Sequence, residues 1–185
     1  MTKKPPLDRR VKRTRRQLRE SLVKLILDRG WDDVTVQDVC VAADVGRSTF
    51  YVHFADKEEL LLSGFDDLHE SLAASINAPL RGPFGFAKNL VDHAQENLRL
   101  FKAVIGKRSG ASVQRRFRDV VLQLIDDDLA RMKVAKEKRL WASRYISGGF
   151  IEMLLHWLES PRPPSSAELA STFLSQTAGL LATLR

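Results

Sequence analysis

Apolar residues recur at helical spacing along most of the chain, three or four positions apart with polar residues between them. This period is typical of amphipathic helices that bury one face. Helices are predicted on this pattern over 14–29, 36–43, 47–54, 57–78, 84–98, 100–105, 113–132, 136–159 and 166–184. No segment alternates between apolar and polar residues as a half-buried strand does. The pattern therefore predicts an all-α protein.

The second and third of these helices are short and separated by a tight turn. Thr35 can accept a hydrogen bond from the amide of Asp38, whose carboxylate can reach back, so a helix is predicted to begin at Val36. The pattern breaks at 44–46, where Gly46 is expected to supply the conformational freedom of the turn. Two short helices around such a turn are typical of a DNA-reading helix-turn-helix.

The second short helix divides into a buried face and open faces. Phe50 and Phe54 lie four residues apart and are predicted to point inward, which leaves Tyr51 and His53 on other faces. Arg47 opens this helix, and its guanidinium can donate two hydrogen bonds to a guanine edge, the commonest specific contact in the major groove. We therefore expect this helix to read base edges.

The stretch GRSTFYVHF at 46–54 is followed by DKEELL at 56–61. With Gly30, Trp31 and Thr35 at a matching spacing, it resembles the signature of the TetR family of bacterial transcriptional regulators. The resemblance covers roughly the first third of the chain and joins several independent features. It implies an N-terminal three-helix helix-turn-helix domain at 1–61, including a basic arm, and a C-terminal helical ligand-binding and dimerisation domain at 62–185.

The resemblance also implies which side chains touch DNA. The predicted DNA-binding residues are Thr35, Gly46, Arg47, Ser48, Thr49, Tyr51, His53 and Lys57. In the family the counterparts of Thr35, Tyr51 and Lys57 typically touch phosphates, and helix amino termini and hydroxyl groups suit that role. The other polar side chains of the set are expected at bases or at the backbone. The alternative for Tyr51 is a half-buried core ring.

The last two long helices, predicted at 136–159 and 166–184, carry more apolar surface than one neighbour can bury. In the TetR family such a pair typically forms a four-helix bundle with its copy in a second subunit, which implies a homodimer. Adjacent glycines cost a helix about 1 kcal/mol each relative to alanine, so a close approach of another backbone is expected at them. The predicted interface residues are Gly148, Gly149, Trp157, Phe173 and Leu180. The segment 145–158 also resembles a subgroup related to regulators of dihydroxyacetone kinase genes.

Composition argues against a membrane-spanning, secreted or disulfide-bonded protein. The chain has 185 residues, of which 44% are hydrophobic, and no apolar run approaches the roughly 20 residues of a membrane-spanning helix. Its basic start is not followed by the apolar core of a signal peptide, so a cytoplasmic protein is expected. The single cysteine, Cys40, cannot form an internal disulfide and is assigned to packing.

The net charge of +7 indicates an anionic partner, either nucleic acid or membrane. The segment 1–20 holds nine basic residues against Asp8 and Glu20, an excess equal to the net charge of the whole chain. This segment is interpreted either as a solvated tail or as an arm or helix start that follows phosphates. The neighbouring helix-turn-helix favours the second interpretation.

Catalytic and metal chemistry find no support in the sequence. Its four histidines lack zinc-ligand spacing, and neither a nucleophile elbow nor a full phosphate loop is present. The glycine-flanked basic segment 106–110 is interpreted as a loop, and the acidic run 126–128 as a solvated face. We therefore predict a protein that is not an enzyme, with no cofactor, no metal and no catalytic residue.

The leading hypothesis is a homodimeric, ligand-responsive transcriptional regulator, a repressor, that binds a palindromic double-stranded DNA operator. Its C-terminal domain would bind a small molecule or a partner and reset the separation of two reading heads. Candidate pocket residues are Phe117, Trp141, Tyr145 and Met153, which core packing would explain equally well. The alternative is a protein-interaction module, or co-activator, that works through its C-terminal domain.

Overall fold

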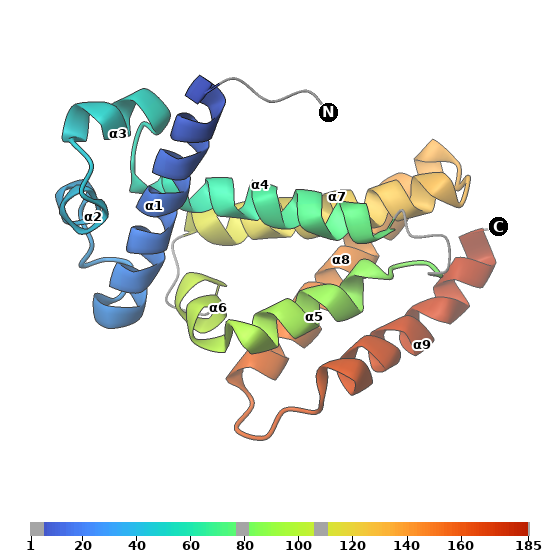
Figure 1. The fold of residues 1–185 in the computed structure, drawn as a ribbon. Coiled ribbons are helices and arrows are strands. Elements are labelled where there is room, and N and C mark those ends of the chain that lie inside the picture. Colours follow the sequence, from blue (N-terminus) through green and yellow to red (C-terminus); the bar gives the residue numbers. More distant parts are fainter. Residues whose placement is uncertain (1–5, 77–81, 106–110, 185) are drawn as a thin grey trace. The chain divides into compact units, whose positions relative to one another are not determined.

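The computed structural model describes residues 6–76, 82–105 and 111–184, and across these ranges every regular element is an α-helix (Figure 1). The predicted all-α fold is confirmed. The chain divides into two compact units, Met1–Gly64 and Phe65–Arg185. The domain boundary predicted after residue 61 lies about one helical turn before the division after Gly64, and both positions fall inside the same helix.

The first unit is a three-helix arrangement completed by the start of a fourth helix. It contains α1 (Pro6–Arg29), α2 (Val36–Ala43), α3 (Arg47–His53) and the first turns of α4 (Lys57–Ile76). α1 packs on α2, and α2 on α3. The core of the unit is formed by Leu18, Leu22, Leu25, Ile26, Val34, Val39, Cys40, Phe50, Phe54 and Leu60, all buried. α1 ends at Gly30, whose φ of 87° is the left-handed conformation that glycine adopts most easily.

α1 begins at Pro6, earlier than the residue 14 predicted from the apolar stripe. Proline suits the first turn of a helix because that turn has no use for its missing N–H. The basic residues of the described N-terminal segment therefore lie on a helix. Lys3 and Lys4 lie outside the described residues.

The second unit contains the rest of α4 with α5 (Phe86–Glu96), α6 (Leu98–Ile105), α7 (Ala111–Arg131), α8 (Lys136–Glu159) and α9 (Ser166–Leu184). α7 packs along α8, α5 along α9, and α6 against both α7 and α8 (Figure 1). Phenylalanine rings link these helices, since Phe150 lies 4.8 Å from Phe173 and 5.7 Å from Phe86 between ring centroids. Part of the core is thus built where α5, α8 and α9 meet.

One predicted boundary and one predicted surface differ from the structure. The break between α5 and α6 falls at Asn97, whose side-chain amide donates to the carbonyl of His93 at 3.0 Å. The loop predicted at 106–110 lies outside the described residues. The solvated face expected at 126–128 is wrong for Asp128, which is 6% exposed.

Asp128 joins the end of α7 to the start of α5. Its carboxylate accepts from the backbone N–H of Phe84 at 3.0 Å and from Arg131 at 2.6 Å. Phe84 has φ 59°, a strained conformation for an aromatic residue, and its ring is fully buried. Burial raises the pKa of the Asp128 carboxyl, and Arg131 partly opposes that effect.

Candidate nucleic-acid interface

The turn between α2 and α3 depends on Asp44. This residue has φ 52° and ψ 46°, and its N–H donates to carbonyls of the last turn of α2. Gly46 has φ −65° and ψ 145°, which any residue adopts, so the prediction that it supplies the conformational freedom is wrong. Aspartate takes the left-handed role because its short polar side chain lowers the cost of that conformation.

α3 stands on two buried rings and exposes the rest of its surface. Phe50 and Phe54 are buried as predicted, with their ring centroids 6.0 Å apart. Arg47, Ser48 and Thr49 are exposed, and Gly46 precedes them as the N-cap. The first turn of α3 is thus open to a ligand, while its base is fixed in the core.

Tyr51 is 50% exposed, so its ring is neither buried in the core nor fully open to solvent. Its ring meets that of Phe50 edge-on with 5.4 Å between the centroids, and the Arg47 guanidinium lies 6.0 Å from the centroid of the Tyr51 ring. A hydrogen bond from Arg47 to Tyr51 raises the pKa of the guanidinium, which stays charged. His53 is half-buried, its ring 6.4 Å from that of Phe54. The structure brings Arg47 and Tyr51 together and keeps His53 nearer the core.

Val52 is a side chain of this surface that the sequence reasoning missed. It is 79% exposed in the last turn of α3, although it is apolar and β-branched. The sequence does contain a signal for its exposure, because Val52 lies outside the apolar stripe formed by Phe50 and Phe54. An exposed apolar side chain among polar neighbours on a reading helix suits contact with the methyl group of thymine.

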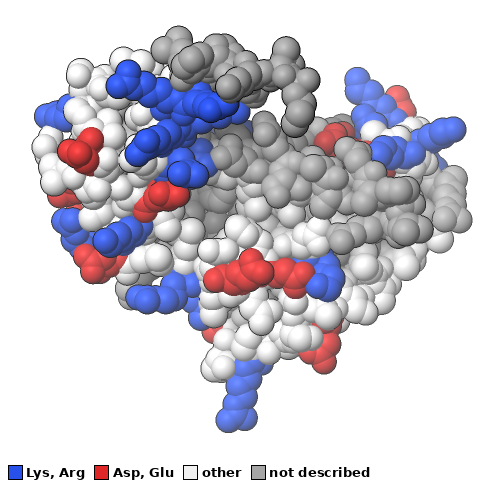
Figure 2. Space-filling model, in the orientation of Figure 1, with Lys and Arg blue, Asp and Glu red and all other residues white. Residues whose placement is uncertain are grey.

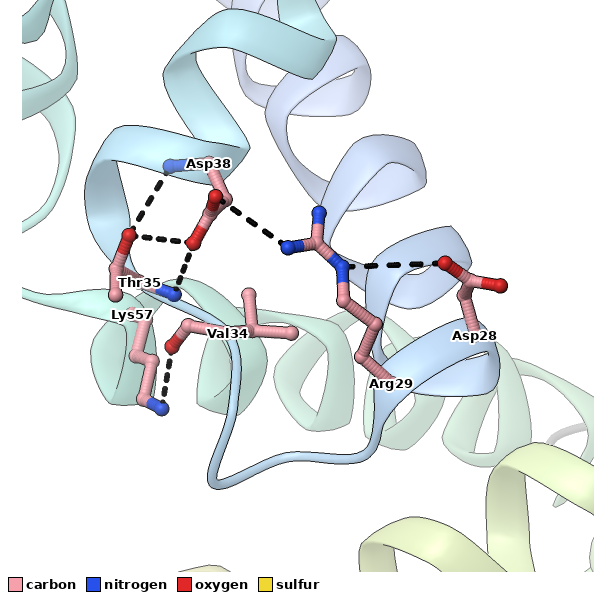
Figure 3. Close-up of polar contacts among 6 residues, drawn as sticks. All are labelled: Asp28, Arg29, Val34, Thr35, Asp38 and Lys57. Atoms are coloured by element: carbon pink, nitrogen blue, oxygen red, sulfur yellow. Dashed lines mark hydrogen bonds and ion pairs between the residues drawn. The ribbon is translucent and has the colours of Figure 1, made fainter.

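The start of α2 carries the capping box that the sequence predicts (Figure 3). The Asp38 N–H donates to the Thr35 hydroxyl oxygen at 3.2 Å, and the Thr35 N–H donates to Asp38 Oδ2 at 2.9 Å. The Thr35 hydroxyl also donates to Asp38 Oδ2 at 2.6 Å. These bonds from Thr35, helped by Arg29, hold the pKa of Asp38 below its ordinary value. A phosphate bound by the Thr35 hydroxyl would have to replace its bond to Asp38.

Lys57 has partners inside the unit. Its ammonium donates to the carbonyl of Trp31 at 2.8 Å and to that of Val34 at 2.6 Å, the second drawn in Figure 3. The same ammonium lies 4.4 Å from the centroid of the Trp31 ring. The phosphate contact expected of Lys57 stays a prediction, and these contacts give the side chain a second role.

Basic side chains gather over the upper part of α1 in Figure 2. The exposed members are Arg9, Arg10, Lys12, Arg13 and Arg16. Arg15 instead lies with its guanidinium 4.6 Å from the centroid of the Phe54 ring. α1 therefore presents positive charge and also supports the ring at the end of α3.

The four candidate pocket residues are not brought together. Phe117 is buried between Phe65 and Phe101, with ring centroids at 5.8 and 6.3 Å. Trp141 and Tyr145 are 74% and 76% exposed on α8, and Met153 is half-buried. Two of these side chains therefore lie on the surface of the single chain. An open groove of about 800 Å³ along α7 and α8 is lined by other residues, among them Arg116, Leu140 and Ser143.

The five candidate interface residues fall into two groups. Trp157 and Phe173 are buried inside the chain, and the Trp157 indole N–H donates to the carbonyl of Pro164 at 2.7 Å. Their assignment to an interface is corrected to core. Gly149 is exposed, Gly148 and Leu180 are half-buried, and a Cβ added at either glycine would meet no atom within 4 Å.

No group of three or more His, Cys, Asp or Glu side chains is placed to hold a metal ion among the described residues. No described helix is both long and apolar enough to cross a membrane.

Comparison with known proteins identifies both parts of the chain. Residues 18–63 match the family described as "Bacterial regulatory proteins, tetR family", and residues 83–177 match "Transcriptional regulator C-terminal region". The HTH-type transcriptional regulator TcmR of Streptomyces glaucescens is 35% identical over 68 residues, which are 37% of this chain and 30% of TcmR. The matched segments span a third or less of the curated relatives.

Solved structures share the fold over nearly the whole chain. A putative TetR-family regulator from Syntrophomonas wolfei matches with a TM-score of 0.72 at 20% identity, covering 91% of this chain and 95% of that one. The dihydroxyacetone kinase operon activator DhaS matches with a TM-score of 0.67 at 16% identity, covering 93% and 98%. The two matched segments and the shared fold agree with the motif at 46–61, and the chain belongs to the TetR family of bacterial transcriptional regulators.

Proposed function

We propose that this regulator binds a specific double-stranded DNA site with α3 in the major groove. The observation that carries the proposal is the exposed row of Arg47, Tyr51 and Val52 on a short helix anchored by buried rings. Such a row combines a guanine-binding fork, a phosphate-binding hydroxyl and an apolar contact for thymine. The exposed cations of α1 would neutralise phosphates and add affinity that falls with salt.

We propose further that the protein acts as a homodimer on a palindromic operator. One recognition helix of two turns reads few base pairs, and a twofold protein requires matching half-sites. The open space over Gly148 and Gly149 supports a second chain there, as do the exposed Trp141 and Tyr145 on the same helix.

Ligand control is the third part of the proposal. Members of the TetR family bind small molecules, and an effector held by the second unit would change the distance between the two α3 helices of a dimer. Because both half-sites must be engaged together, a small change in that distance would lower operator affinity strongly. The expected role is therefore that of a repressor released by its effector.

The test begins with sites selected from random duplex DNA by the wild-type protein, followed by footprinting of the selected site. A twofold-symmetric protected region about one helical turn between half-site centres is expected. A single asymmetric patch would contradict the dimeric proposal, and the absence of any selected sequence would contradict specific recognition.

The alternative function is a co-activator that binds another protein through its second unit. The exposed apolar side chains of α8, Leu140, Trp141 and Tyr145, favour a protein partner as well as a second copy. The fold is also shared with a protein described as an operon activator. A stable complex with a different protein, formed without DNA and without loss of DNA affinity on adding small molecules, would favour this function.

A further inference from the structure

One side of α8 is exposed from the first turn of the helix to the last. Its residues recur three or four positions apart, the spacing that places them on a single helical face. The exposed residues of this face, which form the α8 stripe, are Lys138, Trp141, Tyr145, Gly149, Glu152, His156 and Glu159. The opposite side of the helix carries buried side chains such as Ile146, Phe150 and Leu154.

The α8 stripe has the same spacing from either end. Its steps are three and four residues from Lys138 to Tyr145, and four and three residues from Glu152 to Glu159. The midpoint of the stripe falls between Gly148 and Gly149. A twofold axis at that point would place each residue of one half opposite a residue of the other half in an antiparallel second α8. An isologous contact requires this symmetry.

The residues that such an axis brings together are chemically complementary. The opposed pairs are Lys138 with Glu159, Trp141 with His156, and Tyr145 with Glu152 of the partner subunit. The first pair joins opposite charges, the second joins two flat rings, and the third sets a phenol donor against a carboxylate. Glu152 lies 3.7 Å from Arg118 within its own chain, and its two oxygens allow it to accept from a tyrosine as well.

A parallel second copy would lose these matches, because each residue would then face its own counterpart. The charges of α8 are unevenly divided between its halves. The first half carries Lys136, Lys138, Arg139 and Arg144 against Glu137, and the second half carries Glu152 and Glu159. Like charges would meet along a parallel pair, whereas opposite charges meet along an antiparallel one.

The glycine pair at the centre of the stripe suits a close crossing of two helices. Glycine destabilises a helix relative to alanine, so it needs a reason there. The fold of one chain does not supply that reason, because a Cβ added at Gly148 or Gly149 would meet no atom within 4 Å. A second backbone that crosses α8 at this point does supply it.

We propose that a second copy of this chain packs its α8 antiparallel on the α8 stripe, about an axis between Gly148 and Gly149, and that the three opposed pairs select this partner. The inference rests on the proposed homodimer and adds which residues of the two chains meet. Other regulators share this fold. The opposed pairs let the chain distinguish its own copy from a chain of similar shape with a different α8 surface.

The first experiment tests the register with Tyr145→Cys and Glu152→Cys, each made in a separate chain. In the proposed register the two substituted positions face each other across the axis, whereas two copies of the same position lie about 10 Å apart along the helices, too far for a disulfide. A mild oxidant such as diamide should therefore produce a covalent dimer in an equal mixture of the two variants and in neither variant alone. Wild type is the control, since its single cysteine, Cys40, is buried.

Sedimentation of wild type separates this inference from the proposed homodimer. A wild-type chain that sediments as a monomer contradicts the homodimer itself. A wild-type dimer whose cysteine variants form no covalent dimer in the mixture, or form one in either variant alone, overturns the register. The α8 stripe would then be left to a different protein.

The second experiment reverses the charges of the outer pair. Lys138→Glu and Glu159→Lys should each lower dimer affinity about tenfold, because each variant sets like charges opposite each other at two symmetric places. An equal mixture restores both ion pairs in the mixed dimer, so native mass spectrometry should find more than about half of the dimers mixed, the fraction that random pairing gives.

The matched control for this experiment is Lys136→Glu, an exposed lysine of the same helical turn that lies outside the α8 stripe. It changes the net charge of the chain equally and should leave dimer affinity unchanged. Lys138→Glu dimers as stable as those of Lys136→Glu, or random pairing in the mixture, overturn the proposal.

Discussion

At the scale of single residues, the exposed face of α3 divides its work among side chains of different chemistry. Arg47 offers a planar pair of donors at the first turn, held near the Tyr51 ring. Val52 offers only methyl groups in the last turn of the helix. These two side chains would therefore discriminate base pairs by different physical means, one by hydrogen bonds and one by apolar contact.

Arg47→Ala should relax sequence preference at one base position by about 1 to 3 kcal/mol, because a bidentate contact to guanine is lost. Preference at the other positions should remain. Selection of sites from a random duplex pool by wild type and variant measures this directly. Identical preference profiles would contradict a base-reading role for Arg47.

Val52→Ala should remove discrimination between thymine and deoxyuracil at one operator position. Deoxyuracil lacks only the 5-methyl group, and a buried methyl contributes about 0.8 kcal/mol. Wild type should therefore bind the deoxyuracil operator several-fold more weakly at that position, and Val52→Ala should bind both operators equally. If wild type binds every singly substituted operator as well as the thymine operator, Val52 makes no such contact.

Local sequence signals predicted much of the candidate site. They could not predict contacts between residues that are distant in the sequence. The capping box of Thr35 and Asp38 lies within four residues, so its letters alone identify it. The left-handed Asp44 was missed because the nearby glycine is the more common choice for that conformation. The Lys57 contacts cross more than 20 residues of sequence, and nothing in the local pattern indicates them.

At the scale of elements, the helices follow their apolar stripes, and their ends follow local capping chemistry. α9 illustrates the ends, because Ser165 accepts from the Glu168 N–H at 3.2 Å while its own N–H donates to that carboxylate. α8 was predicted with the bounds that it has. The connection before α5 could not be predicted, since it depends on a carboxylate 44 residues away.

Asp128→Ala should lower the free energy of unfolding by about 1 to 3 kcal/mol, because it leaves the buried Phe84 N–H without an acceptor. Asp128→Asn keeps an oxygen at that position and should cost much less. Chemical denaturation of both variants at neutral pH measures the difference. Equal losses in the two variants would show that the hydrogen bond to Phe84 contributes little.

The pH dependence of this contact has a definite sign. The pKa of Asp128 is higher in the folded chain than its ordinary value, so the folded state holds the proton more tightly. The stability that this carboxyl contributes is present below its ordinary pKa and is lost as pH rises through the folded value. Compared with Asp128→Asn, wild type should therefore gain stability as pH falls from above the folded-state pKa of Asp128 to below its ordinary pKa. A difference that does not change with pH would contradict the shift.

At the scale of the whole molecule, α8 and α9 each have a side that the chain itself leaves uncovered. Trp141, Tyr145 and Gly149 are exposed on α8, and Leu174 is partly exposed on α9. The sequence indicated excess apolar surface on these helices but could not tell which side chains the chain would bury. Trp157 and Phe173 went to the core because neighbouring helices already surround them.

Gly148→Leu and Gly149→Leu should weaken dimerisation by about 1 to 3 kcal/mol through overpacking, with both subunits affected. The single chain has open space at both positions, and leucine favours helix over glycine, so the fold itself should become slightly more stable. Sedimentation and thermal unfolding together measure these opposite effects.

The matched control for these variants is Ala130→Leu, which adds a leucine side chain at an exposed position of α7. It should leave the dimer unchanged. If both glycine variants dimerise as well as wild type and this control, the glycines do not lie at the interface. Operator affinity should fall together with dimer affinity, because one half-site alone holds the protein weakly.

The three tryptophans of the chain occupy three different environments. Trp31 lies beneath an ammonium in the first unit, Trp141 is 74% exposed on α8, and Trp157 is buried with its indole N–H bonded to a carbonyl. Indole emission shifts to shorter wavelength when water is removed from the ring. Chains that retain one tryptophan each would therefore report separately, by fluorescence alone, on the loop beside Lys57, on association through α8 and on unfolding of the core.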